Sequence, residues 1–451
     1  MHLRLRLLLI VLCALLLTAC GGKQTGSRSG RLPGASVQLE DLRRFPQNLE
    51  VYAKAAGQDK PILTQEEQLA QAARFRRILF GPWDMPKTSI RKRDAAAAFG
   101  RARGYRHDAV RWTQPEWDAM KANANLKTFP ARNQAAITIR DTDLRELPTR
   151  ERRFSEPTPD QHANPFDYFQ YSLLPVGTPV LIAHTSRDGR WHYVECPVAG
   201  GWVAAEDLAP VSEELQQTYR NSALAALTRD KVKLASPAGS VTAGVGALLP
   251  LGGTAQGGLQ VLLPVRGADG WATLAPVVLS AADAAAWPLR MTPRNAARVG
   301  NVLMGQPYGW GGMFGDRDCS ALTRELLTPF GIWLPRNSAA QARTGVVVPL
   351  EGLSAREKEE RILQAGVPFL SLVGMRGHIT LYVGKYKGRA AIFHNVWGVR
   401  TVEGADDNAR HVIGKAVVTS ITPGAELKNL YRPVTFVDRL RTLSTPADAL
   451  R

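Results

Sequence analysis

Apolar residues recur at helical spacing in several stretches of the first third of the chain. The clearest is TQEEQLAQAARFRRILF, in which Thr64 and Glu67 have the spacing of a capping box at a helix start. A second such pattern begins at Thr113, again with a glutamate three residues later. Residues 39–131 contain no grouping of residues that indicates chemistry, so we predict a mostly helical supporting segment there.

Further along, the pattern changes to short β-prone runs separated by Gly, Pro, Asp and Asn. TPVLIAHTS, WHYVEC and GWVAAEDLA fall within residues 132–212, and a weaker version of the pattern occupies residues 228–286. Both regions contain an Asp-Gly turn with a tryptophan shortly after it, at 188–189 and 269–270. We predict two small all-β barrels in tandem, a pattern that resembles bacterial SH3-like domains. The first barrel carries an insertion, TRERRFSEPTPDQHANPFDYFQYS, that is too long for a simple hairpin.

The last segment, residues 290–440, combines both periodicities. A helix is predicted to begin at Thr292 and to end at Gly305, and a glycine-rich loop follows it. Next come a helix that begins at Cys319, an inserted helix that begins at Ser354, and a strand hairpin formed by HITLYVG and AIFHNV. Mixed helices and strands of this kind predict an α+β domain.

The N-terminus has the pattern of an export signal. Arginines precede an apolar run at residues 7–17, which is too short to span a bilayer comfortably, and small residues follow it. The ending LTAC resembles the bacterial lipobox, which implies that residues 1–19 are removed and Cys20 is lipidated. Glycine rather than aspartate follows the cysteine, which by the same resemblance indicates the outer membrane. An ordinary cleaved signal is the alternative.

Composition narrows the classes of partner. Residues 20–38 are rich in Gly, Ser and basic residues, which predicts a flexible tether. The formal charge of +17 favours an anionic partner such as nucleic acid, anionic lipid or an acidic wall polymer. Because the sequence contains no zinc-finger spacing, RNA-binding signature or phosphate loop, we expect no nucleic-acid partner, no metal site and no cofactor.

The chain has four cysteines, and Cys13 and Cys20 belong to the predicted export signal. The remaining two, Cys196 and Cys319, lie too far apart to indicate a disulfide framework, and a bridge between them would consume a candidate nucleophile. Cys319 is placed at a predicted first helical turn, where unpaired backbone N–H groups and the helix dipole favour a thiolate. Asp318 can cap that helix. The alternative for Cys319 is a buried inert residue, which is the role that we expect for Cys196.

Two histidines after Cys319 have an informative spacing. His378 and His394 lie on either side of a short Lys/Gly loop, and a turn centred near Tyr386 would place them almost opposite each other. One imidazole could then take the thiol proton while the second fixes its tautomer. A lone strand histidine usually has a structural role, which is the interpretation that we give to His411; the pair favours catalysis.

The order of these motifs resembles the NlpC-type cell-wall cysteine peptidases, a papain-like group. The matching stretches are YGWGG from Tyr308, DCS at 318–320, LPRNSAAQ, Gly377-His378 and His394, in family order. The family hydrolyses peptidoglycan stem peptides, typically between γ-D-glutamate and the diamino acid. Known members combine a lipoprotein signal and two SH3-like domains with this domain, and some also carry an N-terminal stabilising segment.

The resemblance implies a role for each matching residue. Cys319 would be the nucleophile, His378 the base and His394 the orienting group, and Tyr308 would stabilise the oxyanion with the Cys319 backbone N–H. Residues that match positions lining the substrate groove are Trp310, Asp318, Ser320 and Ser338. In relatives the first SH3-like domain favours a free L-Ala amino terminus, for which the insertion offers Asp167 and Tyr168.

Structural roles stay open for these residues: packing under the glycine loop for Tyr308 and Trp310, a helix N-cap for Ser338, and core or turn positions for Asp167 and Tyr168. Two departures from the family also stand in the sequence. The common DCSGL is DCSAL here, and the usual Pro-Gly-Asp strand before the base is replaced by AGVPFLSLVGMRGH.

The expected protein is therefore multidomain, with an α+β papain-like catalytic domain preceded by two small all-β SH3-like barrels and an N-terminal mostly helical stabilising segment. We expect a monomeric, lipid-anchored periplasmic endopeptidase that acts on peptidoglycan stem peptides or muropeptides through an acyl-enzyme. The alternatives are a wall-binding lipoprotein with an inactive catalytic domain, and an amidase or acyltransferase on the same fold.

Overall fold

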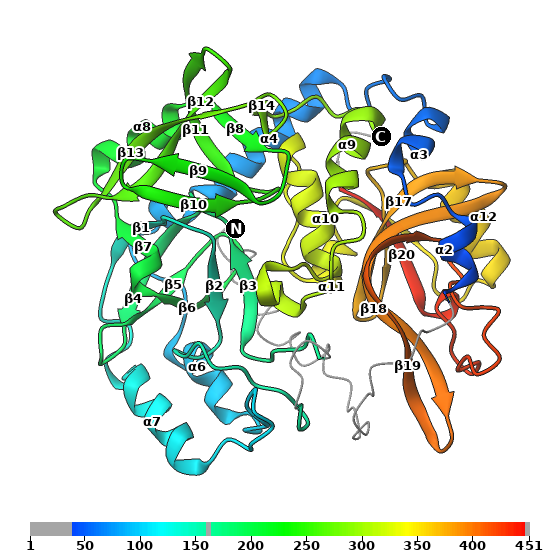
Figure 1. Cartoon of the computed structure of the whole chain (residues 1–451), viewed down its shortest axis with the longest axis horizontal. Coiled ribbons are helices and arrows are strands. Elements are labelled where there is room, and N and C mark those ends of the chain that lie inside the picture. The colour runs from blue at the N-terminus through cyan, green and yellow to red at the C-terminus, as the bar shows by residue number, and fades with distance from the viewer. Residues whose placement is uncertain (1–37, 159–163, 447–451) are drawn as a thin grey trace, which may run out of the picture.

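The computed structural model describes residues 38–158 and 164–446. The predicted signal, the cysteine predicted to be lipidated and nearly all of the predicted tether lie outside those residues. Within them, no helix is both long enough and apolar enough to cross a membrane. Figure 1 shows helices at the N-terminus, two neighbouring β domains, and a C-terminal domain in which helices pack against a sheet, as predicted.

The N-terminal segment is mostly helical. Both capping boxes predicted there, at Thr64 and at Thr113, are present with their reciprocal hydrogen bonds. The helices are α2 (Glu40–Arg44), α3 (Leu49–Ala55), α4 (Gln65–Leu79), α5 (Gly81–Asp84), α6 (Lys92–Ala96) and α7 (Gln114–Ala124).

These N-terminal helices contribute their apolar residues to cores that they share with the other domains. Leu49 and Tyr52 of α3 are buried in the core of the C-terminal domain. Phe75 of α4 packs in a core that contains residues of both β domains. Ala124 of α7 packs with Trp202 inside the first β domain. The segment therefore ties the other three parts of the molecule together, as its blue-to-cyan course in Figure 1 illustrates.

The first β domain is a seven-stranded antiparallel sheet in the order β3-β2-β6-β5-β4-β1-β7. Its predicted insertion connects β2 to β3. Cys196 follows β5, where its buried thiol donates to the Ala199 carbonyl, and burial raises its pKa to about 11. A thiolate is therefore disfavoured. The strands are β1 (Gln134–Thr138), β2 (Thr142–Arg145), β3 (Gln170–Leu174), β4 (Pro179–Thr185), β5 (Trp191–Glu195), β6 (Gly200–Ala204) and β7 (Leu208–Pro210).

Helix α8 (Glu213–Asn221) leads into the second β domain, which has a five-stranded sheet and a separate hairpin, β9–β10. Its first strand, β8, begins before the predicted boundary at 228, because Leu224 and its neighbours pair with both β11 and β14. The strands are β8 (Leu224–Leu227), β9 (Val232–Ser236), β10 (Gly239–Ala243), β11 (Leu248–Ala255), β12 (Gly258–Arg266), β13 (Ala272–Leu279) and β14 (Ala284–Trp287).

The C-terminal domain has a six-stranded antiparallel sheet in the order β15-β20-β16-β17-β18-β19. Thr292 caps the first helix as predicted, but that helix ends at Leu303 rather than Gly305. The capping box at Ser354 is also present. The elements are α9 (Pro293–Leu303), α10 (Cys319–Leu327), α11 (Ser338–Gln341), α12 (Ala355–Ala365), β15 (Val346–Pro349), β16 (Leu372–Met375), β17 (His378–Tyr386), β18 (Arg389–Glu403), β19 (Asp406–Thr419) and β20 (Leu440–Thr445).

Helix α10 lies between the sheet and the other domains, and all of its residues are buried. One side packs on β17 and β18. At its start, Arg317 forms ion pairs with Glu325 of α10 (2.6 Å) and with Asp230 of the second β domain (2.6 Å). The start of α10 is thereby tied to the second β domain.

Candidate active site

Cys319 is the first residue of α10, as predicted, and its side chain is 6% exposed. Asp318 is the N-cap: one carboxylate oxygen accepts the backbone N–H groups of Ser320 (3.1 Å) and Ala321 (2.8 Å). The other oxygen accepts the N–H of Gly311 (3.0 Å). The sulfur is therefore placed at the positive end of the helix dipole, where a negative charge is stabilised.

The two predicted histidines contact each other. The Nε2 atom of His378 lies 2.8 Å from the Nδ1 atom of His394. Their pairing differs from the expected one: Leu381 is opposite Phe393 in the ladder, so His394 lies diagonally from His378. The turn sits beyond Tyr386, at residues 387–388, and a bulge between Tyr382 and Gly384 shifts the register. Diagonal neighbours are still within reach of long side chains.

The hydrogen bonds beyond His394 determine which ring nitrogens carry protons. The Thr419 hydroxyl donates to the Ser420 carbonyl (2.8 Å), so toward the Nε2 atom of His394 (3.1 Å) it can only accept. His394 therefore holds its proton on Nε2 and accepts at Nδ1, and His378 donates from Nε2. The nitrogen left on His378 to act as a base is Nδ1.

Both imidazoles are neutral at physiological pH. Burial, reinforced by the charge of Arg439, lowers the pKa of His378 to about 3. Burial and the neighbouring His378 lower the pKa of His394 well below its ordinary value. The rings of both histidines are also covered by Phe436, at centroid distances of 6.0 Å and 5.7 Å. A neutral His378 is the form that can accept a proton from a thiol.

Arg336 is a site residue that we did not predict. Its guanidinium is buried and donates to both oxygens of Asp318, to the Ser320 hydroxyl (2.9 Å) and to the hydroxyl of Ser172 on β3 (2.9 Å). Burial alone would raise the pKa of Asp318, but the adjacent Arg336 guanidinium holds that pKa below its ordinary value. The two residues that flank Cys319 are therefore fixed in place, and the first β domain takes part in fixing them.

Aromatic residues from two domains meet beside the glycine loop. Phe166, from the insertion of the first β domain, packs against Tyr308, Trp310 and Trp397 of β18, with ring centroids 5.8, 5.7 and 5.9 Å apart, respectively. The ring centroids of Tyr168 and Trp310 are 6.3 Å apart. The backbone N–H of Trp310 also donates to the Pro165 carbonyl (2.9 Å). Tyr168, Tyr308 and Trp310 therefore lie in one cluster, and Phe166 and Trp397 are members that the sequence did not reveal.

The remaining predicted groove residues are placed differently. The Asp167 carboxylate is 1% exposed and pairs with Arg145 (2.7 Å), which favours the structural role for this residue. Ser338 is buried at the start of α11, but the N-cap of that helix is Asn337. The N-cap alternative for Ser338 is therefore wrong. His411 lies on β19 opposite Val399, away from the histidine pair.

Asn395, next to His394, was also missed by sequence reasoning. Its side-chain N–H₂ donates to the carbonyls of Pro307 (3.0 Å) and Arg317 (2.8 Å), the residues that precede Tyr308 and Asp318. Strand β18 thereby supports both loops that border the thiol. The sequence offered one signal for Asn395, its position directly after His394 on a buried strand. A buried amide needs polar partners.

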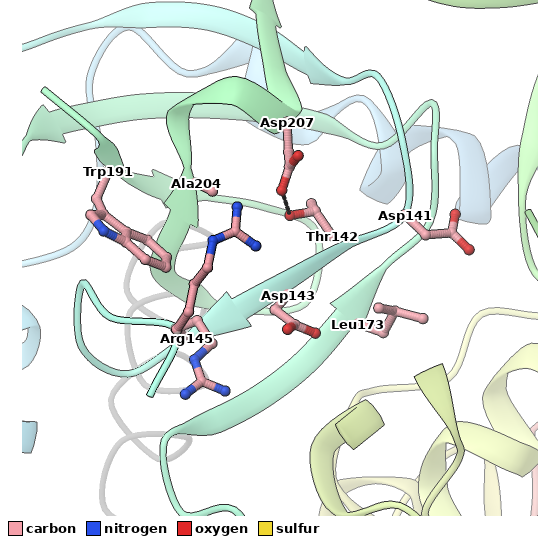
Figure 2. Close-up of a pocket in the computed structure, with 9 residues that line it drawn as sticks. Asp141, Thr142, Asp143, Arg145, Leu173, Trp191, Ala204 and Asp207 are labelled. Carbon is pink, nitrogen blue, oxygen red and sulfur yellow. Dashed lines mark hydrogen bonds between the residues drawn. The ribbon is translucent and has the colours of Figure 1, made fainter. Parts of the chain in front are cut away.

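A separate polar pocket of about 130 Å³ lies in the first β domain and is shown in Figure 2. Asp143 and Arg145 of β2 face it, and Thr142 donates to Asp207 at its edge (2.7 Å). None of the predicted site residues lines it. In the parts of the chain that the structure describes, no group of three His, Cys, Asp or Glu side chains could hold a metal ion.

Comparison with known families matches three parts of the chain. Residues 305–406 match the NlpC/P60 family, residues 152–204 match an SH3 domain of the SH3b1 type, and residues 9–129 match the N-terminal NLPC_P60 stabilising domain. The last match begins inside the predicted signal. The SH3 match falls in the first β domain.

Two curated proteins are similar over shorter stretches. The γ-D-glutamyl-L-lysine dipeptidyl-peptidase of Bacillus subtilis is 31% identical over 94 residues, 21% of this chain and 30% of that protein. A probable endopeptidase of Corynebacterium glutamicum is 28% identical over 138 residues, 30% of this chain and 59% of that protein. This chain thus spans less than two thirds of the length of either relative.

Among solved structures, one described as a novel NlpC/P60 endopeptidase from Photobacterium damselae subsp. piscicida superposes with a TM-score of 0.79. It is 24% identical and covers 92% of this chain and 99% of its own. The two chains share a fold across all of their domains.

Proposed function

Since the C-terminal domain belongs to the NlpC/P60 family of peptidases, we propose that this protein hydrolyses peptidoglycan stem peptides at the bond between γ-D-glutamate and the diamino acid. The observation that carries the proposal is the 2.8 Å bond between His378 and His394 in the same domain as a cysteine that opens a buried helix. That arrangement supplies a nucleophile, a base and a group that orients the base.

In the proposed first step, the Nδ1 atom of His378 takes the proton of the Cys319 thiol, and the sulfur attacks the γ-carbonyl carbon of D-glutamate. The carbonyl π electrons move to oxygen, giving a tetrahedral oxyanion next to the first turn of α10, where the Cys319 backbone N–H and the Tyr308 hydroxyl are the proposed donors. The intermediate then collapses, the C–N bond breaks, and His378 returns the proton to the departing amine.

The second step hydrolyses the resulting thioester. Water adds to the thioester carbonyl as His378 takes one of its protons, and the carbon–sulfur bond breaks. The products are the γ-carboxylic acid of the glutamate, which loses its proton to solvent and becomes a carboxylate, and a thiol that recovers the proton from His378. Because His394 and Thr419 keep Nε2 of His378 protonated, the same Nδ1 atom serves both steps.

The acyl part of the substrate is proposed to lie along the cluster of Tyr168, Tyr308 and Trp310, beside Asp318 and Ser320. Those side chains come from the first β domain, from the loop before α10 and from the first turn of α10. We also propose that the chain acts in the periplasm, as a monomer attached to the outer membrane by a lipid on Cys20; mass spectrometry of the mature N-terminus tests that attachment.

The test is mass spectrometry of the products released from a defined stem tetrapeptide. The wild-type protein is expected to release the diamino acid–D-Ala dipeptide, and Cys319→Ala is expected to release none while keeping the circular dichroism spectrum and melting temperature of the wild type. Cys196→Ala is the matched control and should keep full activity. Cleavage at another bond, or undiminished release by Cys319→Ala, would refute the proposal.

A further inference from the structure

Arg324, in the middle of α10, has a buried guanidinium with very few partners. The residue is 8% exposed. Among the described residues, none accepts a hydrogen bond from its Nε atom, and its one ion pair, with Glu325, is 3.6 Å long. That distance is longer than a hydrogen bond. Burial lowers the pKa of Arg324, because the long contact with Glu325 offsets only part of the lost hydration.

The acidic groups around Arg324 are committed to other partners. Glu325 accepts a 2.6 Å hydrogen bond from Arg317. Asp318, at the start of the same helix, is held by its N-cap bonds and by the ion pair described above. The neighbouring thiol of Cys196 is uncharged, because burial raises its pKa to about 11. The donors of Arg324 are therefore left available for an acceptor that the protein itself does not supply.

Arg324 lines a cavity of about 40 Å³ at which all four parts of the molecule meet. The rest of its wall is mostly apolar, and includes Phe75 of α4, Val176 and Val198 of the first β domain, and Leu248 of β11. A cavity of this volume has room for about three water molecules, or for one small organic anion. None of the residues assigned to the proposed active site lines it. The cavity therefore combines one set of unused donors with an apolar surface.

We propose that this cavity binds a small aliphatic monocarboxylate, which accepts hydrogen bonds from Arg324 and places its alkyl group against the apolar wall. The fork of guanidinium N–H groups matches the two oxygens of a carboxylate. Glu325 also lines the cavity and would repel a second negative charge, so a dianion such as sulfate is disfavoured.

Because the ligand would contact all four parts of the molecule, its binding should stabilise the junction between them. The inference does not depend on the proposed function. Arg324 follows Cys319 by five residues, which places it about 7.5 Å further along the axis of α10.

The experiment is urea unfolding of the full-length protein in sodium acetate, and in acetamide with sodium chloride at the same ionic strength. Acetamide is the matched control, because it keeps the shape of acetate and removes the charge. A ligand as small as acetate is expected to bind with a Kd of about 1–10 mM. About 100 mM acetate should then lower the unfolding equilibrium constant of the wild type about ten- to a hundredfold. Acetamide should lower it less than about twofold.

Arg324→Met separates binding in this cavity from a general effect of acetate. Methionine fills the space of the side chain without its charge, and Glu325 keeps its partner Arg317, so the variant should fold and lose the acetate effect. Arg356→Met, at an exposed arginine of α12, should keep the effect. If Arg324→Met did not fold, Arg324→Lys would replace it, and the loss of the guanidinium fork should weaken the acetate effect.

Three results would each overturn the proposal. The first is equal stabilisation by acetate and acetamide, and the second is an acetate effect that survives substitution of Arg324. The third is a wild type that does not respond to acetate, which would mean that water alone fills the cavity.

Discussion

Thr419 decides which nitrogen of His378 is basic, although one histidine separates it from the base. Its hydroxyl has a single proton, which is committed to the Ser420 carbonyl, so it can only accept from His394. Each hydrogen bond in the relay from His378 through His394 to Thr419 then has one possible direction. The lowered pKa of both imidazoles keeps the relay neutral at the pH at which a peptidase of this type would act.

Replacing Thr419 by valine should therefore impair catalysis more than binding. The Nε2–H of His394 would be left buried without an acceptor, which costs about 1–3 kcal/mol and favours the tautomer with its proton on Nδ1. That tautomer cannot accept from His378. We expect kcat to fall about tenfold while KM stays within a factor of about two. Steady-state kinetics test this, and Thr419→Ser, which keeps the hydroxyl, should retain near-normal kcat. Equal kcat values for Thr419→Val and the wild type would show that the relay does not matter.

Sequence reasoning at the residue scale correctly placed Cys319 at a helix start and brought His378 and His394 together, because the signals are local: a capping aspartate, a hairpin and a characteristic spacing. It missed Arg336 and Asn395, whose roles depend on partners that are distant in the chain, and it left Asp167 open between a substrate role and a position in the core. No local pattern distinguishes a carboxylate that faces a substrate from one that pairs with Arg145 inside a barrel.

At the scale of single elements, the start of α10 depends on one buried ion pair. Asp318 caps the helix and also neutralises Arg336, so its two functions can be separated by substitution. Asparagine is a good N-cap but carries no charge.

We expect Asp318→Asn to keep α10 capped and to destabilise the protein by about 3–5 kcal/mol, because a buried guanidinium loses its partner. The loss should be present at neutral pH and should shrink as the pH falls. The lowered pKa of Asp318 means that the ion pair contributes stability above the unfolded-state value of 3.8, and that this stability is lost as the pH falls through the folded-state pKa. Urea unfolding at several pH values measures it. Asp316→Asn, two residues earlier and outside this network, should cost little, and a similar loss in both variants would contradict the assignment.

Elements with local signals were predicted well. The capping boxes at Thr64, Thr113 and Ser354 each involve residues three apart, so the sequence contains the whole interaction. The hairpin that carries the histidines was predicted with a displaced turn and without its bulge. Gly384 borders that bulge with a φ of 123°, and a glycine inside a strand is a signal for a bulge that the prediction did not use.

At the scale of the whole molecule, the N-terminal segment stabilises a domain that is far away in the sequence. Leu49 is fully buried in the core of the C-terminal domain, and its amide donates to the side chain of Asn301 on α9 (2.8 Å). Helical periodicity predicted the helices of this segment, but it could not reveal that their apolar faces belong to other cores.

Leu49→Ala should consequently destabilise the catalytic domain although the substitution lies about 270 residues before Cys319. A large-to-small change at a buried site of this kind costs about 2–5 kcal/mol. The measurement is the midpoint of denaturant unfolding, with loss of peptidase activity as the readout. Leu69→Ala changes a leucine that is 53% exposed on α4 and should shift stability by no more than about 0.5 kcal/mol. If activity survived to the wild-type midpoint in Leu49→Ala, the two regions would be energetically independent.

The contact between β3 and the glycine loop has a consequence for how such a chain can be rearranged. A Cβ atom on Gly311 would lie 2.6 Å from the Gln170 carbonyl oxygen, and one on Gly312 would lie 2.8 Å from the Leu173 side chain. Both glycines have a positive φ (65° and 96°), so two independent constraints exclude larger residues. At this place the backbone of the catalytic domain packs directly against strand β3 of the first β domain. A chimera that grafts this catalytic domain onto a foreign barrel would need a strand of the same shape at that spot, whereas exchanging both domains as one block would preserve the fit.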